Sequence, residues 1–168
     1  MSLSVVYTRA AIGVKAPLIS VEVHLSNGLP GLTLVGLPET TVKEARDRVR
    51  SAIINSGYTF PARKITINLA PADLPKEGGR YDLPIAIALL AASEQLNTTR
   101  LGSYEFIGEL ALTGSLRGVP GAISGALEAI SAGRQIIVAN ENSPEVSLIA
   151  EKGCLIASHL QEVCAYLE

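Results

Sequence analysis

Residues 64–96 of this chain read KITINLAPADLPKEGGRYDLPIAIALLAASEQL. Polar and β-branched residues alternate over Lys64–Leu69, which predicts a half-buried strand. A loop with two glycines follows over Ala70–Gly79, and the nearly continuous apolar run of Tyr81–Leu96 predicts a buried helix with Pro84 in its first turn. A strand followed by a buried helix predicts an α/β fold.

The same alternation extends to both sides of this stretch. Ile19, Val21 and Val23 alternate with polar residues, the pattern of a strand with one buried face. Further strands are expected at Ser4–Thr8, Leu18–Leu25, Leu32–Val35, Ile136–Ala139 and Leu155–Ala157, with a hairpin of Glu105–Leu112 and Ser115–Arg117 around Thr113-Gly114. Helices are expected at Thr41–Asn55, Gly121–Ser131, Pro144–Glu151 and His159–Leu167. No linker or repeat interrupts this order, so residues 1–168 are expected to form a single domain.

Composition bounds the class of protein. Hydrophobic residues make up 48% of the chain and aromatic residues only 4%, so the core must be largely aliphatic. The net charge of −2 disfavours a free-standing nucleic-acid-binding domain, although a local basic face remains open. The most apolar run, Leu83–Ala92, is shorter than the roughly 20 residues that cross a bilayer, so no membrane partner is expected. Cys154 and Cys164 have no metal-binding or redox spacing, which favours buried, reduced thiols in the cytoplasm.

Signatures of catalysis are absent from the sequence. No phosphate-binding Walker A loop and no Gly-x-Ser-x-Gly elbow occurs, and no residues stand at zinc-ligand spacing. His24 and His159 are isolated, which is typical of surface histidines or of polar residues with satisfied hydrogen bonds rather than of catalytic bases. The sequence therefore predicts no catalytic residue and no metal site.

One candidate site is the loop that precedes the buried helix. Gly78 and Gly79 permit unusual backbone conformations, and the following helix would point free amide groups at the loop. Lys76 and Arg80 add positive charge, which suits an anion such as a phosphate. The alternative is a strand-to-helix turn with solvated charges.

A second, weaker candidate is the basic face of the helix at Thr41–Asn55. Lys43, Arg46 and Arg50 lie on one side, opposite an apolar stripe, as a nucleic-acid or partner contact would require. Acidic residues lie among them, and Glu44 can pair with Arg48 one turn later. A solvated, salt-bridged helix face is the alternative.

Four long segments carry a resemblance to a known family. Gly28–Glu39, Val42–Ile53, Ile67–Pro84 and Ile107–Gly118 closely resemble the N-terminal domain of the ComM (YifB) family, bacterial ring ATPases of the magnesium-chelatase-like AAA+ class. The resemblance covers almost the entire chain. It implies a βαβ-rich fold like the proteolytic domain of Lon, shared with a ribosomal-protein domain and with small-molecule kinases.

The resemblance also implies a function. Members of this family promote branch migration when incoming single-stranded DNA is recombined during natural transformation, and the whole protein resembles a hexameric DNA translocase. ATP and Mg²⁺ would belong to an ATPase module beyond this chain, so no cofactor is expected here. DNA, single-stranded or branched, the protein's own ATPase module and further copies in a homo-hexamer are the partners that the resemblance implies.

The comparison with Lon can be made residue by residue. Aligned on Lon's motifs, the nucleophilic serine falls on Arg80 and the lysine base falls on Ile123. A Ser–Lys dyad needs a hydroxyl and an amine within hydrogen-bond reach, and neither residue supplies one. The sequence therefore predicts a domain that is not an enzyme.

Two expectations follow for the isolated chain: it should hydrolyse neither ATP nor peptides, and it should be monomeric or weakly associated. A third concerns the whole protein. If DNA translocation involves this domain, we expect Lys76 and Arg80 to contact DNA phosphates without needing burial. Two rivals remain: a small enzyme that binds phosphate at the Gly78-Gly79 loop, and a pure oligomerisation scaffold. A DNA-contacting domain and a pure scaffold would differ in whether the cations at 43, 46, 50, 76 and 80 converge on one exposed face.

Overall fold

The computed structural model describes residues 2–76 and 78–168, with the main chain alone at 150–152. Glu77, in the glycine-containing loop, and the side chain of Glu151, at the end of an expected helix, lie outside the described residues. The strands are β1 (Leu3–Arg9), β2 (Leu18–Ser26), β3 (Gly31–Val35), β4 (Lys64–Ala70), β5 (Tyr104–Phe106), β6 (Glu109–Leu110), β7 (Leu116–Arg117), β8 (Gln135–Ala139) and β9 (Cys154–Ala157). The helices are α1 (Glu39–Asn55), α2 (Asp82–Ala92), α3 (Ala122–Ser131), α4 (Ser143–Val146) and α5 (Leu160–Leu167), and 3-10 helices lie at Leu101–Ser103, Asn140–Asn142 and Ser147–Lys152.

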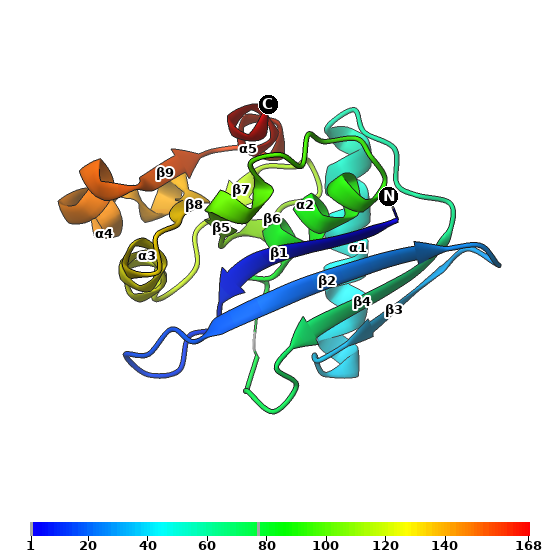
Figure 1. Cartoon of the computed structure of the whole chain (residues 1–168), viewed down its shortest axis with the longest axis horizontal. Coiled ribbons are helices and arrows are strands. Elements are labelled where there is room, and N and C mark those ends of the chain that lie inside the picture. Colours follow the sequence, from blue (N-terminus) through cyan, green and yellow to red (C-terminus); the bar gives the residue numbers. More distant parts are fainter. Residues whose placement is uncertain (1, 77) are drawn as a thin grey trace.

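Seven of the described strands form one mixed sheet in the order β3-β4-β2-β1-β5-β8-β9, and β6 pairs with β7 separately. β2 runs antiparallel to both β1 and β4, whereas β3 is parallel to β4, and β1, β5, β8 and β9 are parallel to one another. The expected α/β class is confirmed. The first strand of the chain therefore lies in the middle of the sheet (Figure 1).

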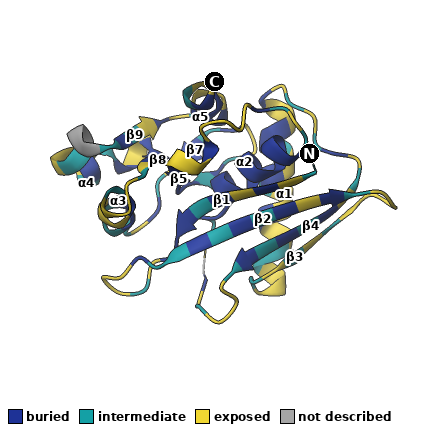
Figure 2. Ribbon diagram, viewed as in Figure 1, coloured by how far each residue is buried: buried dark blue, intermediate teal, exposed yellow. Residues whose placement is uncertain are grey.

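The two halves of the sheet differ in how they are covered. We call β3, β4, β2 and β1 the N-terminal half-sheet, and β5, β8 and β9 the C-terminal half-sheet. Along β2, every second residue is buried and the residues between are half-buried or exposed, an alternation visible in Figure 2. Along β8, Ile136 and Val138 are as fully buried as Ile137 and Ala139. One half thus has a face with little cover, while β5 and residues 136–139 of β8 in the other half are buried on both sides and the edge strand β9 is partly open.

The helices account for this difference. α2 packs against β1 and β2, and each of its residues is buried, since α1 covers its outer side. This layer forms one apolar core with the inward side chains of β1, β2 and β4. α3 packs against β8 on the other face and builds a second core with Ile136 and Val138. No comparable helix covers the outer face of β2 and β4 in the described part of the chain (Figure 1).

Three expected elements differ from the structure. The strand expected at Glu105–Leu112 is divided at Gly108, because the Gly108 amide donates to Arg80 O at 3.2 Å and its carbonyl accepts from Leu83 N at 3.1 Å. The chain leaves the large sheet there to bond with the start of α2, and only β6 and β7 form the expected hairpin.

The other two differences concern helix ends. α2 ends at Ala92, because Ser93 Oγ donates to Leu89 O at 2.8 Å and Glu94 adopts a positive φ of 61°. The helix expected at Pro144–Glu151 is α-helical only to Val146 and then continues as a 3-10 helix. The described residues include no helix of the length and apolar character that a membrane span requires.

Candidate functional site

The glycine-containing loop borders a pocket of about 490 Å³ between the start of α2 and the segment before α3. Gly78 has a φ of +74°, a conformation that favours glycine, and Gly79 has no room for a side chain because the Glu109 carboxylate lies against it. Arg80 and Pro120 also form part of the wall. The sequence therefore located a real concavity at this loop.

Arg80, however, lies inside the protein. It is only 6% exposed; its Nε donates to Arg9 O and its Nη1 to Pro120 O, both at 3.0 Å. Burial lowers the pKa of Arg80, and the neighbouring Tyr81 and Glu145 oppose this change. The guanidinium remains charged, as arginine does in proteins. Its Nη2 is buried and has no hydrogen-bond partner among the described residues.

Lys76 is turned inward as well. Its residue is 5% exposed, and Nζ donates to Pro71 O at 2.6 Å and to Leu74 O at 3.2 Å. Desolvation lowers the pKa of Lys76, while Asp73 raises it. The expectation that Lys76 and Arg80 need no burial is wrong, because main-chain carbonyls from the loop and from β1 converge on them. Anion binding at this loop stays a prediction.

The pocket wall contains no pair of groups suited to nucleophilic catalysis among the described residues. At the position of Lon's lysine, Ile123 offers only its main-chain amide, which donates to Glu145 Oε1 at 3.1 Å. Burial raises the pKa of Tyr81 to about 12, so its phenol is neutral and is a poor base. Groups of His, Cys, Asp or Glu that could hold a metal ion do not occur in the described residues.

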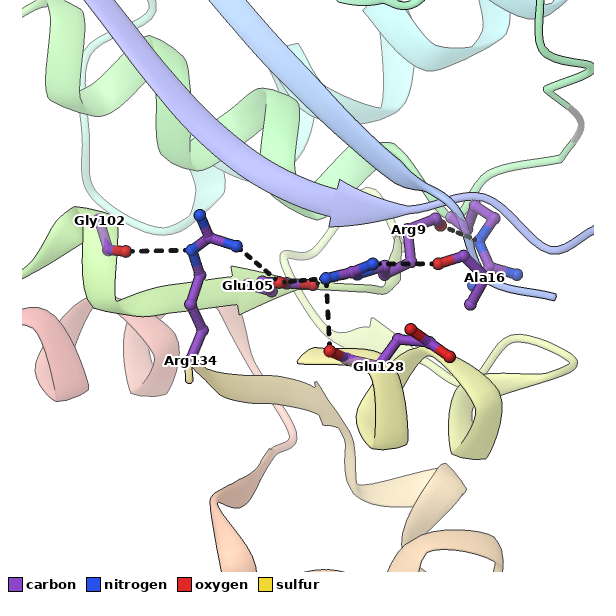
Figure 3. Close-up of polar contacts among 7 residues, drawn as sticks. Arg9, Ala16, Gly102, Glu105, Glu128 and Arg134 are labelled. Carbon is purple, nitrogen blue, oxygen red and sulfur yellow. Dashed lines mark hydrogen bonds and ion pairs between the residues drawn. The ribbon is translucent and has the colours of Figure 1, made fainter. Parts of the chain in front are cut away.

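A buried charge network missed by the sequence lies beside the pocket, where β1 meets β5 (Figure 3). Glu105 is fully buried, and its carboxylate accepts from Arg9 Nε at 2.7 Å and Arg9 Nη2 at 2.9 Å. Arg134 Nη1 donates to the same carboxylate at 3.2 Å, and its guanidinium carbon lies 4.1 Å from the Tyr7 ring centre. Arg9 also carries the carbonyl that accepts from Arg80, so the network continues to the pocket.

A second buried carboxylate joins α1 to α2. Asp82 accepts from Arg48 Nε at 2.6 Å, from Arg48 Nη2 at 3.2 Å and from Leu110 N at 3.1 Å. Glu44, the partner expected for Arg48, is 3.8 Å away and largely exposed. Burial raises the pKa of Asp82 to about 6, against the lowering effect of Arg48. This ion pair connects α1 to α2 and so has a structural role.

The basic face of α1 is where the sequence placed it. Lys43, Arg46 and Arg50 are exposed, opposite the buried Ala45 and Val49. The guanidinium carbon of Arg50 lies 5.5 Å from the centre of the ring of Phe60, and Arg46 is 3.8 Å from the Asp47 carboxylate. The five candidate cations therefore do not converge on one exposed face, since those at 76 and 80 are buried.

The remaining candidates have structural roles. His159 Nδ1 accepts from Gln161 N at 3.1 Å and caps α5, and His24 is exposed on β2. Cys154 and Cys164 are free and buried, as expected. Burial raises the pKa of Cys164 to about 11, which keeps its thiol protonated and unreactive.

Comparison with known proteins places this arrangement in context. The family model described as subunit ChlI of Mg-chelatase matches residues 21–142. The uncharacterized protein YifB of Salmonella typhimurium is 78% identical over 168 residues, which is 100% of this chain and 33% of that protein. Competence protein ComM of Haemophilus influenzae is 58% identical over 167 residues, 99% of this chain and 33% of that protein. An uncharacterized protein of Mycobacterium tuberculosis is 38% identical over 150 residues, 89% of this chain and 30% of that protein. The chain thus spans about a third of the length of the curated relatives it matches.

Proposed function

We propose that this chain is the non-catalytic N-terminal domain of an ATP-dependent DNA-processing protein. The chain belongs to the family of subunit ChlI of Mg-chelatase, and YifB and ComM are among its relatives. In this proposal the whole protein acts in the cytoplasm, as a hexameric ring that drives branch migration during recombination and natural transformation. The printed name of the Haemophilus relative, competence protein, supports this assignment. ATP and Mg²⁺ would bind in the ATPase module, outside these residues.

The observation that carries the non-catalytic part is the position of Arg80. An enzyme of the Lon kind would need a hydroxyl there, poised beside an amine base. Arg80 instead donates to two main-chain carbonyls, one on β1 and one before α3, and so fastens three segments of the fold together. A buried cation with two such partners supports a structural role. The domain would then contribute ring architecture, DNA contact or both.

The test compares the 168-residue chain with the whole protein. The chain should hydrolyse neither ATP nor a casein-derived peptide mixture, whereas the whole protein should hydrolyse ATP and move a branched DNA junction. Turnover by the chain that disappears in Arg80→Met would contradict the non-catalytic assignment. A whole protein that leaves branched DNA unchanged in the presence of ATP would contradict the DNA-processing assignment.

A second candidate is anion binding in the pocket at Gly78 and Gly79. One observation favours it: Nη2 of Arg80, in the pocket wall, is buried without a hydrogen-bond partner in the described residues. An unpaired buried donor is costly, and a bound phosphate or carboxylate would satisfy it. Titration of the chain with inorganic phosphate, followed by the amide NMR signals of the two glycines, tests this candidate. Saturable shifts would support it, and unchanged signals at 20 mM phosphate would not.

A further inference from the structure

A separate groove of about 550 Å³ lies between α1 and the edge of the N-terminal half-sheet formed by β3 and β4. Its lining combines apolar side chains, three arginines and one carboxylate, among them Leu32, Phe60, Arg46, Arg50, Arg63 and Asp47. The arginines come from two places, α1 and the segment between α1 and β4. None of these residues lines the pocket at the glycine-containing loop. A volume of this size is comparable with pockets that enclose small ligands.

Charge is concentrated around this groove. The groove lining itself contains three arginines and one carboxylate, a net charge of +2, so the rest of a chain with net charge −2 carries −4. Lys43 and Lys64 are both exposed, one on α1 and the other at the start of β4. In an acidic protein, a groove with a net positive charge attracts polyanions.

The groove arginines are held loosely compared with those elsewhere. Arg46 Nε is 3.8 Å from Asp47, an exposed carboxylate, and Arg63 Nη2 reaches Leu25 O only at 3.4 Å. Arg9 and Arg48, by contrast, donate to buried carboxylates at 2.7 Å and 2.6 Å. Donors with long contacts are the ones that a new ligand can recruit at little cost.

The aromatic ring of Phe60 in the groove indicates which kind of polyanion the groove can bind. Phe60 is half-buried, and the Arg50 guanidinium lies over its ring. Unpaired bases stack on aromatic rings and on guanidinium planes, whereas the bases of a duplex are already stacked on one another. An acidic peptide would use the arginines but would gain nothing specific from the ring.

We propose that this groove binds a single strand of nucleic acid, with phosphates on Arg46, Arg50 and Arg63 and a base stacked over the Arg50–Phe60 pair. The inference rests on the proposed function and gives it a site. It also moves the DNA contact away from Lys76 and Arg80, which are buried and donate to main-chain carbonyls through Lys76 Nζ and through Arg80 Nε and Nη1.

The test uses fluorescein-labelled (dT)15 and the 168-residue chain, with anisotropy measured from 50 mM to 500 mM KCl. Two phosphate contacts on a single strand contribute about 1.4 to the salt slope, so Arg46→Gln with Arg50→Gln should flatten it by that amount. If the unchanged chain and the double variant have equal affinities at 1 M salt, this difference in slope makes the affinity of the double variant at 50 mM KCl roughly 50-fold lower. The matched control, Lys15→Gln with Arg117→Gln, removes two exposed charges that do not line the groove and should change neither quantity.

Phe60→Leu keeps an apolar floor and removes the ring. It should weaken (dT)15 binding roughly tenfold while leaving the salt slope unchanged. Unchanged far-UV circular dichroism and melting temperature in each variant would establish that folding is intact. NMR shifts of the Arg46, Arg50 and Arg63 Nε–H signals should locate the strand in the groove.

Several outcomes would overturn the groove inference. They are a double variant that binds (dT)15 as the unchanged chain does, NMR shifts elsewhere, an undetectable affinity at 50 mM KCl, or equal affinity for poly-glutamate. The proposed function is judged separately, by ATP-dependent movement of branched DNA by the whole protein. If the whole protein moves DNA while the groove variants bind normally, the function stands and the groove inference fails.

Discussion

The two halves of the sheet bury their side chains in different ways. In the N-terminal half-sheet, one row of residues enters the core and the other remains half-buried or exposed, as Val23 and His24 do on β2. In the C-terminal half-sheet, β8 is buried along Ile136–Ala139 without alternation. Antiparallel strands with one face toward water alternate, whereas parallel strands covered by helices on both faces read as continuous apolar runs. A single sheet here contains both patterns, and β3 at its edge is the exception, because it pairs in parallel with β4 and still alternates between half-buried and exposed residues.

A buried charge network connects the two half-sheets where β1 meets β5. Arg9 comes from β1, Glu105 from β5 and Arg134 from the turn before β8, so neither half contains the network alone. Buried ion pairs seldom add net stability over apolar residues, but removing one partner leaves a buried charge unpaired. The junction therefore depends on all three residues together.

The largest effect is expected from a cation on the doubly covered strand. Ile136→Lys removes a fully buried side chain at a cost of about 2–5 kcal/mol and adds the larger cost of an unpaired buried ammonium. The sum approaches the whole stability of a typical domain, about 5–15 kcal/mol. We expect a largely unfolded chain by far-UV circular dichroism. A cooperative thermal transition within a few degrees of the unchanged chain would show that β8 has an accessible face.

The second-largest loss of stability is expected at the junction of the two half-sheets, where Arg9 meets Glu105. Glu105→Ala leaves the buried Arg9 guanidinium without its carboxylate and should lower the free energy of unfolding by about 3–5 kcal/mol in urea titrations. Arg9→Met together with Glu105→Leu removes both charges and should recover most of the loss. If the single variant loses less than about 1 kcal/mol, the halves are held by packing alone.

The third effect lies within the covered face of the N-terminal half. Because burial raises the pKa of Asp82 to about 6 from 3.8, this carboxyl contributes stability that is complete below about pH 4 and is lost as pH rises through 6. Asp82→Asn cannot titrate. Between pH 7 and pH 4, the difference in unfolding free energy between the two proteins should shift by about 2 kcal/mol in favour of the unchanged chain. A difference that is independent of pH would mean that the Arg48 ion pair fully offsets the effect of burial on Asp82.

The smallest effect is expected on the open face. Thr66 lies on that face of β4, opposite His24 of β2 and Thr33 of β3. Thr66→Lys should change the free energy of unfolding by less than about 1 kcal/mol, because a lysine there can extend into water. The same urea titration used for Ile136→Lys measures it. A loss of several kcal/mol in the free energy of unfolding would show that this face of β4 is not open to water, and the two half-sheets would then not differ in their cover.

Local patterns were enough to predict most of the elements. Alternation predicted β2, and the apolar run predicted α2, because burial of one face or of all sides leaves a periodicity in the sequence. The strand expected at Glu105–Leu112 failed because Gly108 bonds to Arg80 and Leu83, residues distant in sequence. No local pattern records such a partner.

Partners that are distant in sequence also explain which parts of the candidate site could not be predicted. The sequence located the loop with Gly78 and Gly79, and also the exposed α1 cations, since both are defined by neighbours in the chain. It could not foresee that Arg80 meets the carbonyl of Arg9, or that Glu105 is buried, because those partners are far apart in sequence. Phe60 was missed because a lone aromatic residue in a loop carries no signal until Arg50 is placed above it.

The central place of β1 bears on how the chain is made. β1 leaves the ribosome before the other strands of this sheet, and β2 can pair with it almost at once. Its other edge must wait for β5, since Arg9 and Glu105 are 96 residues apart. A chain is synthesised from its N-terminus, so the edge of β1 that pairs with β5 stays open until residues 104–106 have left the ribosome. During that interval the Arg9 guanidinium stays hydrated. Its water is lost only when Glu105 arrives, so the desolvation of this one side chain marks the moment at which two partial folds become one.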